Sequence, residues 1–270
     1  RWVDDTWLNR LSNASDYHVE RSKELGASGK GLDLEPDHTA ECPRLRRLTS
    51  PVDHDDTFRE FALEGPAAAL AQAILGGPVR FHHSKLNYKW SDGGEEVKWH
   101  QDIQFFPHTN YNVLTIGCYL ADTTMENGPL AALRGSHNME LFNQYDAAGN
   151  WTGMLSDEDA ASINFDDVEY MTGKAGSITI HNARTLHYSP SSKNPVPRPL
   201  LLNCYTSADA KPYTPHPSPT VNTYKVVRGS QVQWAHHDPR PCQLPPDWSG
   251  GYSSIYAAQA GEDKDTKSMM

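Results

Sequence analysis

The residues best suited to chemistry lie in the segment Trp99-His100-Gln101-Asp102, where one residue separates a histidine from an aspartate. The segment falls in a β-like run, and side chains alternate along a strand, so His100 and Asp102 are predicted to share one face about 7 Å apart. One metal ion can then be reached by both. Such a pair suits Fe(II), and a second histidine would complete a three-ligand face with positions open for a bidentate cosubstrate and O₂.

His187 is the predicted third ligand. It lies in the β-like run 185–189 and precedes the turn-forming segment Ser189-Pro190-Ser191-Ser192, so we expect it at a sheet edge facing a cavity mouth. His181 is the alternative from the same part of the chain. The chain contains thirteen histidines, so a His-x-Asp pair can arise by chance. The other histidines near turns are interpreted as structural or surface residues: His137, His236 and His237.

Arg198 strengthens the metal hypothesis. It begins the β-like run that follows His187, and Ser189 stands two positions after the histidine. A strand, a proline-rich turn and a returning strand would set the guanidinium beside the metal. Its fixed fork of donors suits the far carboxylate of 2-oxoglutarate, whose other end chelates the metal, better than a lysine would. The simpler alternative for Arg198 is a surface arginine in a loop.

Composition narrows the class of protein. A chain of 270 residues and 30.1 kDa favours one large domain with a buried core. The net charge of −10 and the pI near 5.7 disfavour nucleic acid and anionic membranes as partners, and the only basic cluster is Arg44-Leu45-Arg46-Arg47.

The cysteines and the apolar runs predict a location in the cytosol. Cys42, Cys118, Cys204 and Cys242 lie far apart, which suggests neither a structural zinc site nor a disulfide framework. No run approaches the roughly 18 apolar residues of a membrane span, and residues 1–10 lack the apolar core of a signal peptide.

The pattern of elements predicts how these residues are positioned. Residues 66–75 read as a helix, with Pro66 in its first turn and Gly76-Gly77 at its end. Short β-like runs follow at 79–88, 97–106, 113–121, 177–180, 185–189 and 200–206. We expect antiparallel sheets packed as a double-layer barrel, with helices of the first third covering one side.

We therefore expect a single oxygenase domain over residues 1–260. Its expected parts are a helical cover over about 1–77, a barrel over about 79–210 and a C-terminal extension over 211–260, followed by a flexible polar tail at 261–270.

Four stretches of the chain resemble the phytanoyl-CoA dioxygenase family of Fe(II)/2-oxoglutarate oxygenases. They are FHHSKLNYK from Phe81, WHQDIQFFPHTN from Trp99, ENGPLAALRGSH from Glu126 and HNARTLHYSPSSKNPVPRP from His181. The resemblance covers about residues 79–210. It implies a mainly β fold with flanking helices, a double-stranded β-helix of the jelly-roll, cupin-like type.

Site residues follow from the resemblance position by position. It implies that His100, Asp102 and His187 bind iron and act as the catalytic set. It further implies that Arg198 and Ser189 hold 2-oxoglutarate with help from Asn87, and that Lys85 touches cosubstrate or substrate. Trp99 and Phe106 are candidates for the substrate pocket because they lie close to the ligands, although aromatic strand residues are often core. Arg134 departs from the family, which usually has proline there, with little expected effect on chemistry.

The expected function is an Fe(II)- and 2-oxoglutarate-dependent dioxygenase that hydroxylates a small organic molecule with release of succinate and CO₂. Asp102 argues against a halogenase, since related halogenases replace this carboxylate. One alternative is a cupin-like metal-dependent isomerase or hydrolase that does not use 2-oxoglutarate, against which Arg198 argues. A second is a non-catalytic binding module, which would be expected to have lost a ligand. The pattern predicts neither the substrate nor an oligomeric state.

Overall fold

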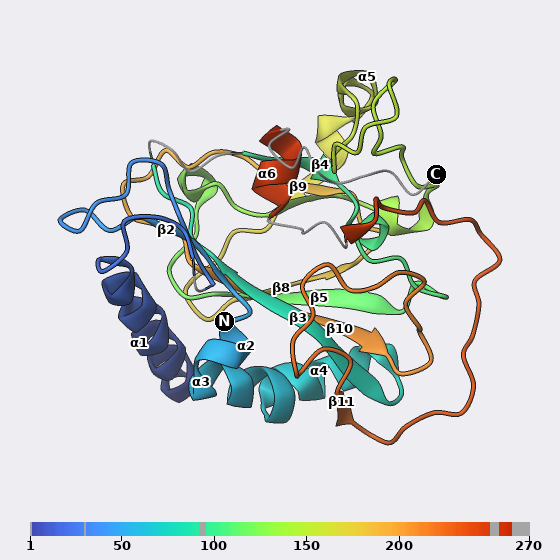
Figure 1. Cartoon of the computed structure of the whole chain (residues 1–270), viewed down its shortest axis with the longest axis horizontal. Helices are drawn as coiled ribbons and strands as arrows, with labels where there is room; N and C mark the ends of the chain where they lie inside the picture. The colour runs from blue at the N-terminus through green and yellow to red at the C-terminus, as the bar shows by residue number, and fades with distance from the viewer. Residues whose placement is uncertain (1, 30, 92–95, 249–253, 261–270) are drawn as a thin grey trace.

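Two antiparallel β-sheets face each other in the computed structural model, and helices cover the outer side of the larger sheet (Figure 1). The structure describes residues 2–29, 31–91, 96–248 and 254–260. The predicted tail at 261–270 lies outside these residues.

The larger sheet has the strand order β1-β2-β3-β10-β5-β8, and β11 pairs with β3 beside this path. Its strands are β1 (Leu32–Leu34), β2 (Leu45–Thr49), β3 (Val79–Asn87), β5 (Val113–Tyr119), β8 (Ile178–Asn182), β10 (Leu200–Ser207) and β11 (Val226–Arg228). Every residue of β5 and β10 is buried, because helices cover one face of these central strands and the interior of the fold covers the other.

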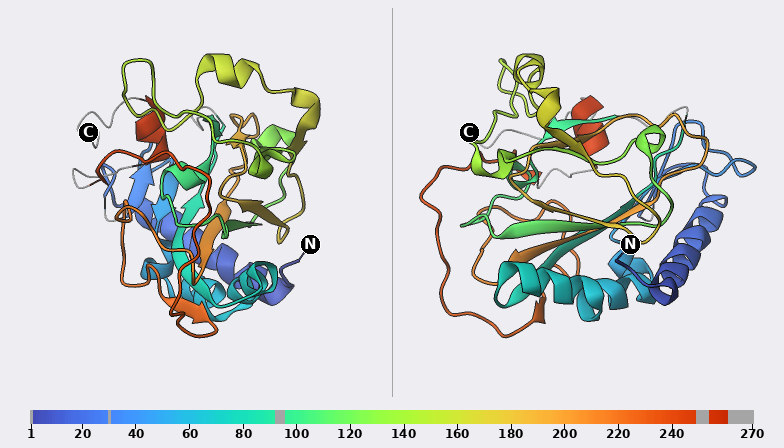
Figure 2. Two further views of the ribbon diagram at one scale, coloured as in Figure 1. Left: turned by 90° about the vertical axis from the view of Figure 1, so that its right-hand side faces the viewer. Right: turned by 180° about the vertical axis from the view of Figure 1, so that it is seen from behind.

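The smaller sheet has the order β4-β9-β6-β7. Its strands are β4 (Val97–His100), β6 (Ala131–Leu133), β7 (Val168–Tyr170) and β9 (His187–Ser189). Figure 2 shows this sheet stacked over the larger one. The strands form two separate sheets, so together they make a jelly-roll barrel that is not closed. This arrangement agrees with the predicted double-layer fold.

Helices of the first third pack on the outer face of the larger sheet, as predicted. They are α1 (Asp5–Ser22), α2 (Pro51–His54), α3 (Asp56–Arg59), the π-helical segment η1 (Glu60–Glu64) and α4 (Pro66–Leu75). The Asp4 side chain caps α1 by accepting a hydrogen bond from the Trp7 amide at 2.8 Å. Helix α4 has the predicted bounds, and Gly76 ends it in the left-handed conformation at φ 74°.

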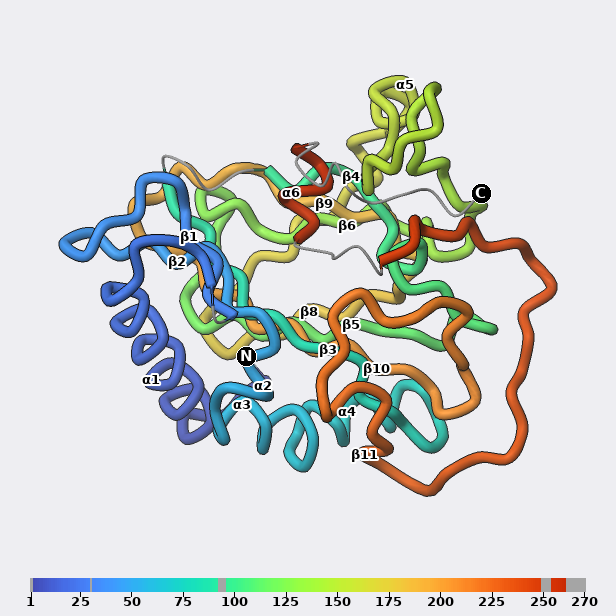
Figure 3. The backbone as a smooth tube through the Cα atoms, in the orientation of Figure 1, coloured from blue at the N-terminus to red at the C-terminus, as the bar shows by residue number. Residues whose placement is uncertain are grey.

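The remaining helical elements are short. They are the 3-10 turns η2 (Asp102–Gln104), η3 (Met125–Asn127), η4 (Ser136–Asn138) and η5 (Phe165–Asp167), and the helices α5 (Asp157–Ala161) and α6 (Ile255–Ala260). The chain that follows β11 passes along the outside of the molecule before α6 returns to pack beside β4 (Figure 3).

The predicted strand over 97–106 was wrong in its second half. Strand β4 ends at His100, and Asp102 begins the 3-10 turn η2. The buried side chain of Gln101 donates a hydrogen bond to the Arg184 carbonyl at 2.8 Å, and the Ile103 amide donates to the Ala183 carbonyl at 2.9 Å. These bonds turn the chain, so a tight turn rather than strand alternation brings Asp102 back toward His100.

The first third also contains two strands that were not predicted, β1 and β2. The basic cluster at 44–47 lies mostly within β2, where Leu45 and Leu48 are buried in the core. The charged residues of the cluster interrupt the apolar run that would indicate a strand, so β2 was missed. No helix among the described residues combines the length and the apolar character needed to cross a membrane.

Candidate metal centre and cosubstrate pocket

His100, Asp102 and His187 come together in the space between the sheets. His100 is the last residue of β4, Asp102 opens the turn that follows, and His187 begins β9. Asp102 Oδ1 lies 3.7 Å from His100 Nε2 and 3.9 Å from His187 Nε2. Each residue offers one ligand atom, and these atoms lie within 4.8 Å of one another. Donors that each bind one ion at about 2 Å lie roughly 3 Å apart at neighbouring positions, so these three atoms lie slightly farther apart than bound ligands and would close around an ion.

The unused nitrogens of both histidines are occupied. His100 Nδ1 is 2.8 Å from the Lys98 carbonyl, and His187 Nδ1 is 2.8 Å from the Thr185 carbonyl. Each Nδ1 must carry the proton to donate this bond, so each Nε2 presents its lone pair to the centre. Lone pairs presented in this way are suited to bind a metal ion.

Burial sets the charges of this group. Burial lowers the pKa of His100 to about 4 and the pKa of His187 well below its ordinary value. Burial alone would raise the pKa of Asp102, but the nearby histidines, His187 first, and Lys85 hold it well below its usual range. At neutral pH the group therefore offers two neutral imidazoles and one carboxylate, the protonation states that metal binding requires.

His181, the alternative ligand, lies on β8 in the opposite sheet. Its Nε2 is 3.6 Å from Asp102 Oδ2, whereas His100 and His187 approach Oδ1 of the same carboxylate. His181 thus lies at Oδ2, the oxygen of Asp102 that faces away from the other two histidines and is called its outer oxygen below. A residue that orients a metal ligand would lie there.

Arg198 is buried, with 3% of its surface exposed. Its Nη2 lies 3.4 Å from Ser189 Oγ, and its guanidinium lies over the Tyr119 ring at 6.0 Å. Its Nε and Nη1 have no hydrogen-bond partner among the residues that the structure describes. A buried guanidinium with free donors fits a carboxylate that accepts from both nitrogens.

Lys85, Asn87 and Lys89 follow one another at alternate positions along and just beyond β3. Asn87 is paired with Leu200 of β10, and its Oδ1 is buried without a partner among the described residues. Lys89, which was not predicted, is buried, and its Nζ donates to the carbonyls of Ser189 at 2.9 Å and Pro190 at 2.7 Å. Lys89 therefore fixes the backbone beside Ser189. The spacing 85, 87, 89 could have indicated it, because alternate strand residues share a face.

A partly open cavity reaches Asp102, with an empty volume of about 670 Å³ including its mouth. Lys85 and Phe106 line it, whereas Arg198, Ser189 and Asn87 do not. Trp99 does not line it either. Its ring stacks on Tyr188 at 4.1 Å within the core of the smaller sheet.

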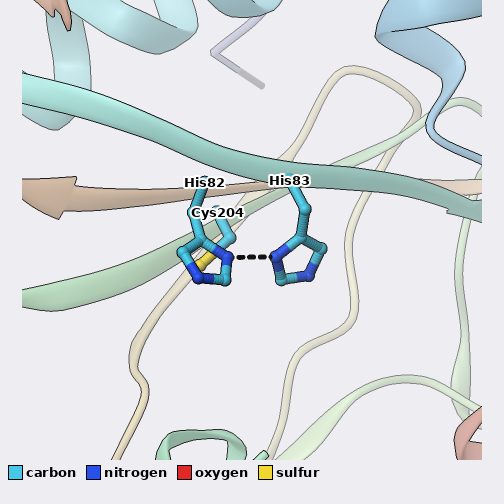
Figure 4. A group of neighbouring side chains, drawn as sticks. All are labelled: His82, His83 and Cys204. Carbon is cyan, nitrogen blue, oxygen red and sulfur yellow. Dashed lines mark hydrogen bonds between the residues drawn. The ribbon is translucent and has the colours of Figure 1, made fainter. Parts of the chain in front are cut away.

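A second cluster of possible ligands, shown in Figure 4, lies on β3 and β10: His82, His83 and Cys204. The two Nδ1 atoms are only 2.6 Å apart. Two nitrogens bound to one tetrahedral ion by bonds of about 2.0–2.1 Å would lie farther apart, so this distance indicates a hydrogen bond. Burial raises the pKa of the Cys204 thiol to about 12, which further disfavours a thiolate ligand.

The sequence did not single out several polar residues on the wall of the cavity. They are Arg47 of β2, His83 of β3 and His216. Arg47 was noted only as part of the basic cluster at 44–47, and its pairing with Asn87 across β2 and β3 is a long-range contact that no local pattern reveals.

Comparison with protein families gives a match over residues 19–200 to the phytanoyl-CoA dioxygenase (PhyH) family. A probable alpha-ketoglutarate-dependent hypophosphite dioxygenase of Stutzerimonas stutzeri is 35% identical over 196 residues, covering 70% of this chain and 68% of the relative. L-proline trans-4-hydroxylase of Streptomyces griseoviridis is 26% identical over 238 residues, covering 80% and 88%.

Solved structures support the fold. EctD from S. alaskensis with 2-oxoglutarate and 5-hydroxyectoine superposes with a TM-score of 0.68 at 21% identity, covering 85% of this chain and 80% of that one. The epimerase SnoN in complex with Fe³⁺, alpha ketoglutarate and nogalamycin RO gives a TM-score of 0.61 at 21% identity, covering 85% and 87%. The predicted fold class is thereby confirmed.

Proposed function

Because this chain belongs to the phytanoyl-CoA dioxygenase family, we propose that its iron is bound by His100, Asp102 and His187. The enzyme is an Fe(II)- and 2-oxoglutarate-dependent dioxygenase. One observation carries the assignment of the ligands: two histidine Nε2 atoms and a carboxylate oxygen converge in a buried space while each Nδ1 is tied to a backbone carbonyl.

Arg198 and Ser189 are the proposed partners of the far carboxylate of 2-oxoglutarate. The guanidinium is buried, two of its donor nitrogens have no partner in the described part of the chain, and Ser189 Oγ lies beside it. Asn87, on the neighbouring strand, offers an amide oxygen without a partner in the described residues, so its proposed role is to support this pocket. Lys89 is proposed as a positioning residue, because it fixes the Ser189 and Pro190 carbonyls.

When bound, iron and 2-oxoglutarate supply the oxidising chemistry, in which O₂ is consumed, CO₂ is lost, succinate is formed and one oxygen atom reaches the substrate. The residues of this chain orient the metal ligands and exclude bulk water from the centre. The paired strands β4 and β9 hold two ligands, the turn after β4 holds the third, and the buried walls keep bulk water away from the centre.

We propose hydroxylation of a small molecule as the reaction. The named relatives act on small substrates such as hypophosphite, L-proline and ectoine. Phe106 is a candidate for the substrate wall because it lines the cavity, whereas the stacking of Trp99 on Tyr188 favours a core role. The comparisons do not support the alternative of a cupin-like isomerase or hydrolase. The single-domain division and the cytosolic location stay predictions.

Metal analysis tests the proposed ligands directly. Under anaerobic conditions the wild type should bind one Fe(II), and His100→Ala, Asp102→Ala and His187→Ala should each lose it, because two remaining ligands cannot hold an open-sided site. Succinate release over a panel of small molecules then measures activity. A variant that retains iron and turnover would remove its residue from the ligand set.

A further inference from the structure

The polar residues that line the cavity beside Asp102 are mostly cationic or hydrogen-bond donors. Two cationic residues, Arg47 and Lys85, and two histidines, His83 and His216, line it together with four serine or threonine residues. Asp102 is the only acidic residue among the described residues that line it, and that carboxylate is assigned to the metal. The wall is therefore rich in hydrogen-bond donors and short of negative charge.

If the proposed function holds, the bound iron and 2-oxoglutarate leave no negative charge over to balance the cations of the cavity wall. The two charges of Fe(II) are matched by Asp102 and the chelating carboxylate of 2-oxoglutarate, and Arg198 matches the far carboxylate. Arg47 lies 3.7 Å from Asp33. Lys85 makes no ion pair or side-chain hydrogen bond with the residues that the structure describes. Its charge is nevertheless felt in the cavity: after burial, it helps to lower the pKa of His83, and with the nearby histidines it lowers the pKa of Asp102.

A β-bulge brings His83 and its neighbour onto one side of the sheet. In the pairing of β10 with β3, Cys204 lies opposite His83 and Tyr205 lies opposite Phe81, so His82 is the extra residue. Adjacent strand residues normally point to opposite faces, but a bulge disrupts this alternation. Figure 4 shows the resulting arrangement, with both imidazoles on the same side of β3 and their Nδ1 atoms 2.6 Å apart.

This pair fixes how His83 can meet a ligand. Burial lowers the pKa of both histidines well below the ordinary value, so both are neutral and one Nδ1 proton is shared between them. His82 Nε2 is buried without a partner among the described residues. A buried N–H without a partner is rarer than a buried lone pair without one, which favours the tautomer in which His82 donates from Nδ1. His83 then carries its proton on Nε2 and donates from it.

The apolar part of the cavity lies next to the metal ligand. Phe105 and Phe106 line it close to Asp102 in the chain, and the charged and polar groups come from β2, β3 and the segment around His216. A bound molecule is thus offered a polar anchor together with an apolar wall near the oxidising centre.

We propose that this cavity binds a small substrate through an anionic, oxygen-bearing group, a phosphorus oxyanion or a carboxylate, held by Lys85 and His83 Nε2 with its carbon part against Phe105 and Phe106. The inference rests on the proposed function and adds the substrate class to it. His82 is a positioning residue in this scheme, since it acts through His83.

Calorimetry on the anaerobic Fe(II)–2-oxoglutarate enzyme tests the proposal. Three probes of similar size are titrated: propylphosphonate, butyrate and the uncharged 1-butanol. We expect at least one anion to bind on the order of tenfold or more tightly than the alcohol, and the preferred anion identifies the head group. Equal binding of all three probes, or binding of none, would overturn the proposal.

Matched variants assign the contact to named residues. Lys85→Met should lower anion affinity on the order of tenfold, and His83→Gln should lower it by less because an amide can still donate. Lys225→Met is the control, since Lys225 is exposed and, within the described structure, forms hydrogen bonds through its backbone alone. Unchanged anion affinity in Lys85→Met would exclude this role of Lys85.

A separate titration of 2-oxoglutarate distinguishes the two levels of inference. Lys85→Met should bind 2-oxoglutarate as the wild type does. If the wild type binds neither Fe(II) nor 2-oxoglutarate, the proposed function fails. If Lys85→Met loses 2-oxoglutarate as Arg198→Ala does, Lys85 holds the cosubstrate and only the substrate inference fails.

Discussion

His100 and His187 lie directly opposite each other across the antiparallel strands β4 and β9, and their ring centroids are 4.1 Å apart. Each ties its Nδ1 to the carbonyl two residues before it, that of Lys98 or Thr185. The same local bond thus orients both rings, and the strand pairing sets their separation. Two of the three proposed ligands are therefore held by the pairing of β4 with β9, and Asp102 is the one held by a turn.

His181 provides the first prediction. It lies 3.6 Å from the outer oxygen of Asp102, so it should orient the carboxylate rather than bind the ion. His181→Ala should weaken Fe(II) binding about 10- to 100-fold without abolishing it. Equilibrium dialysis with metal analysis measures this, and His137→Ala, at an exposed histidine, is the control. Complete loss in His181→Ala with retention in His187→Ala would make His181 the ligand.

Arg198 provides the second prediction. Arg198→Ala should weaken 2-oxoglutarate binding roughly 30- to 1000-fold, because losing one buried charge-assisted partner costs on the order of 2–4 kcal/mol. Iron affinity should barely change. Arg198→Lys should recover only part of the loss, since lysine has the charge but no fork of donors. Anaerobic titration of the iron-loaded proteins measures both variants, and equal affinities would place the cosubstrate elsewhere.

The sequence predicted the elements that local signals define, and it missed those that depend on contacts between distant parts of the chain. Helix α4 and strand β3 follow local signals, proline and glycine at the helix ends and a long β-like run, and both were predicted within about a residue of their bounds. The end of β4 was not predicted, because the bonds that stop it go to Ala183 and Arg184, far along the chain.

The site shows the same division. The motif residues His100, Asp102 and His187 could be selected from types and spacing, although the reason given for Asp102, strand alternation, was wrong. The sequence did not single out His83: strand alternation would place it on the opposite face from His82, and the bulge opposite Cys204 and Tyr205 brings the two rings together. A bulge depends on pairing between distant strands, which no window of sequence contains.

His18 provides the third prediction, on stability and pH. It is fully buried on α1, and neither ring nitrogen has a hydrogen-bond partner among the described residues. Burial, followed by Arg21, lowers its pKa to about 4 in the folded protein. Between the unfolded value near 6.5 and about 4, the unfolded chain binds more protons than the folded one, so stability falls as the pH falls through this window.

His18→Leu should therefore remove this sensitivity. Relative to the wild type, the free energy of unfolding of the variant should rise by ~1–2 kcal/mol on going from pH 7.5 to pH 5, with solvent screening allowed for. Urea unfolding at the two pH values measures the difference, and His137→Leu at an exposed site is the control. A difference that does not change with pH would show that His18 is not buried in its neutral form.

Gly128 provides the fourth prediction, which links the fold to the cosubstrate pocket. Its φ is +61°, and a Cβ there would lie 2.3 Å from the Pro190 carbonyl oxygen and 2.7 Å from Lys89 Cδ. Its own carbonyl accepts a hydrogen bond from Ser189 Oγ at 3.0 Å. A methyl group at 128 would therefore push away the segment that carries Ser189 and disturb the lysine that fixes it.

Gly76 offers a matched control, because it has a similar φ of +74° but a Cβ added there would meet no atom within 4 Å. Gly76→Ala should cost only the left-handed backbone strain, whereas Gly128→Ala should cost ~1–3 kcal/mol more because of overpacking. Urea unfolding measures both. Gly128→Ala should also bind 2-oxoglutarate more weakly than Gly76→Ala, since Ser189 lies beside Arg198. Equal stability and equal affinity in the two variants would show that the segment after Ser189 yields without disturbing the pocket.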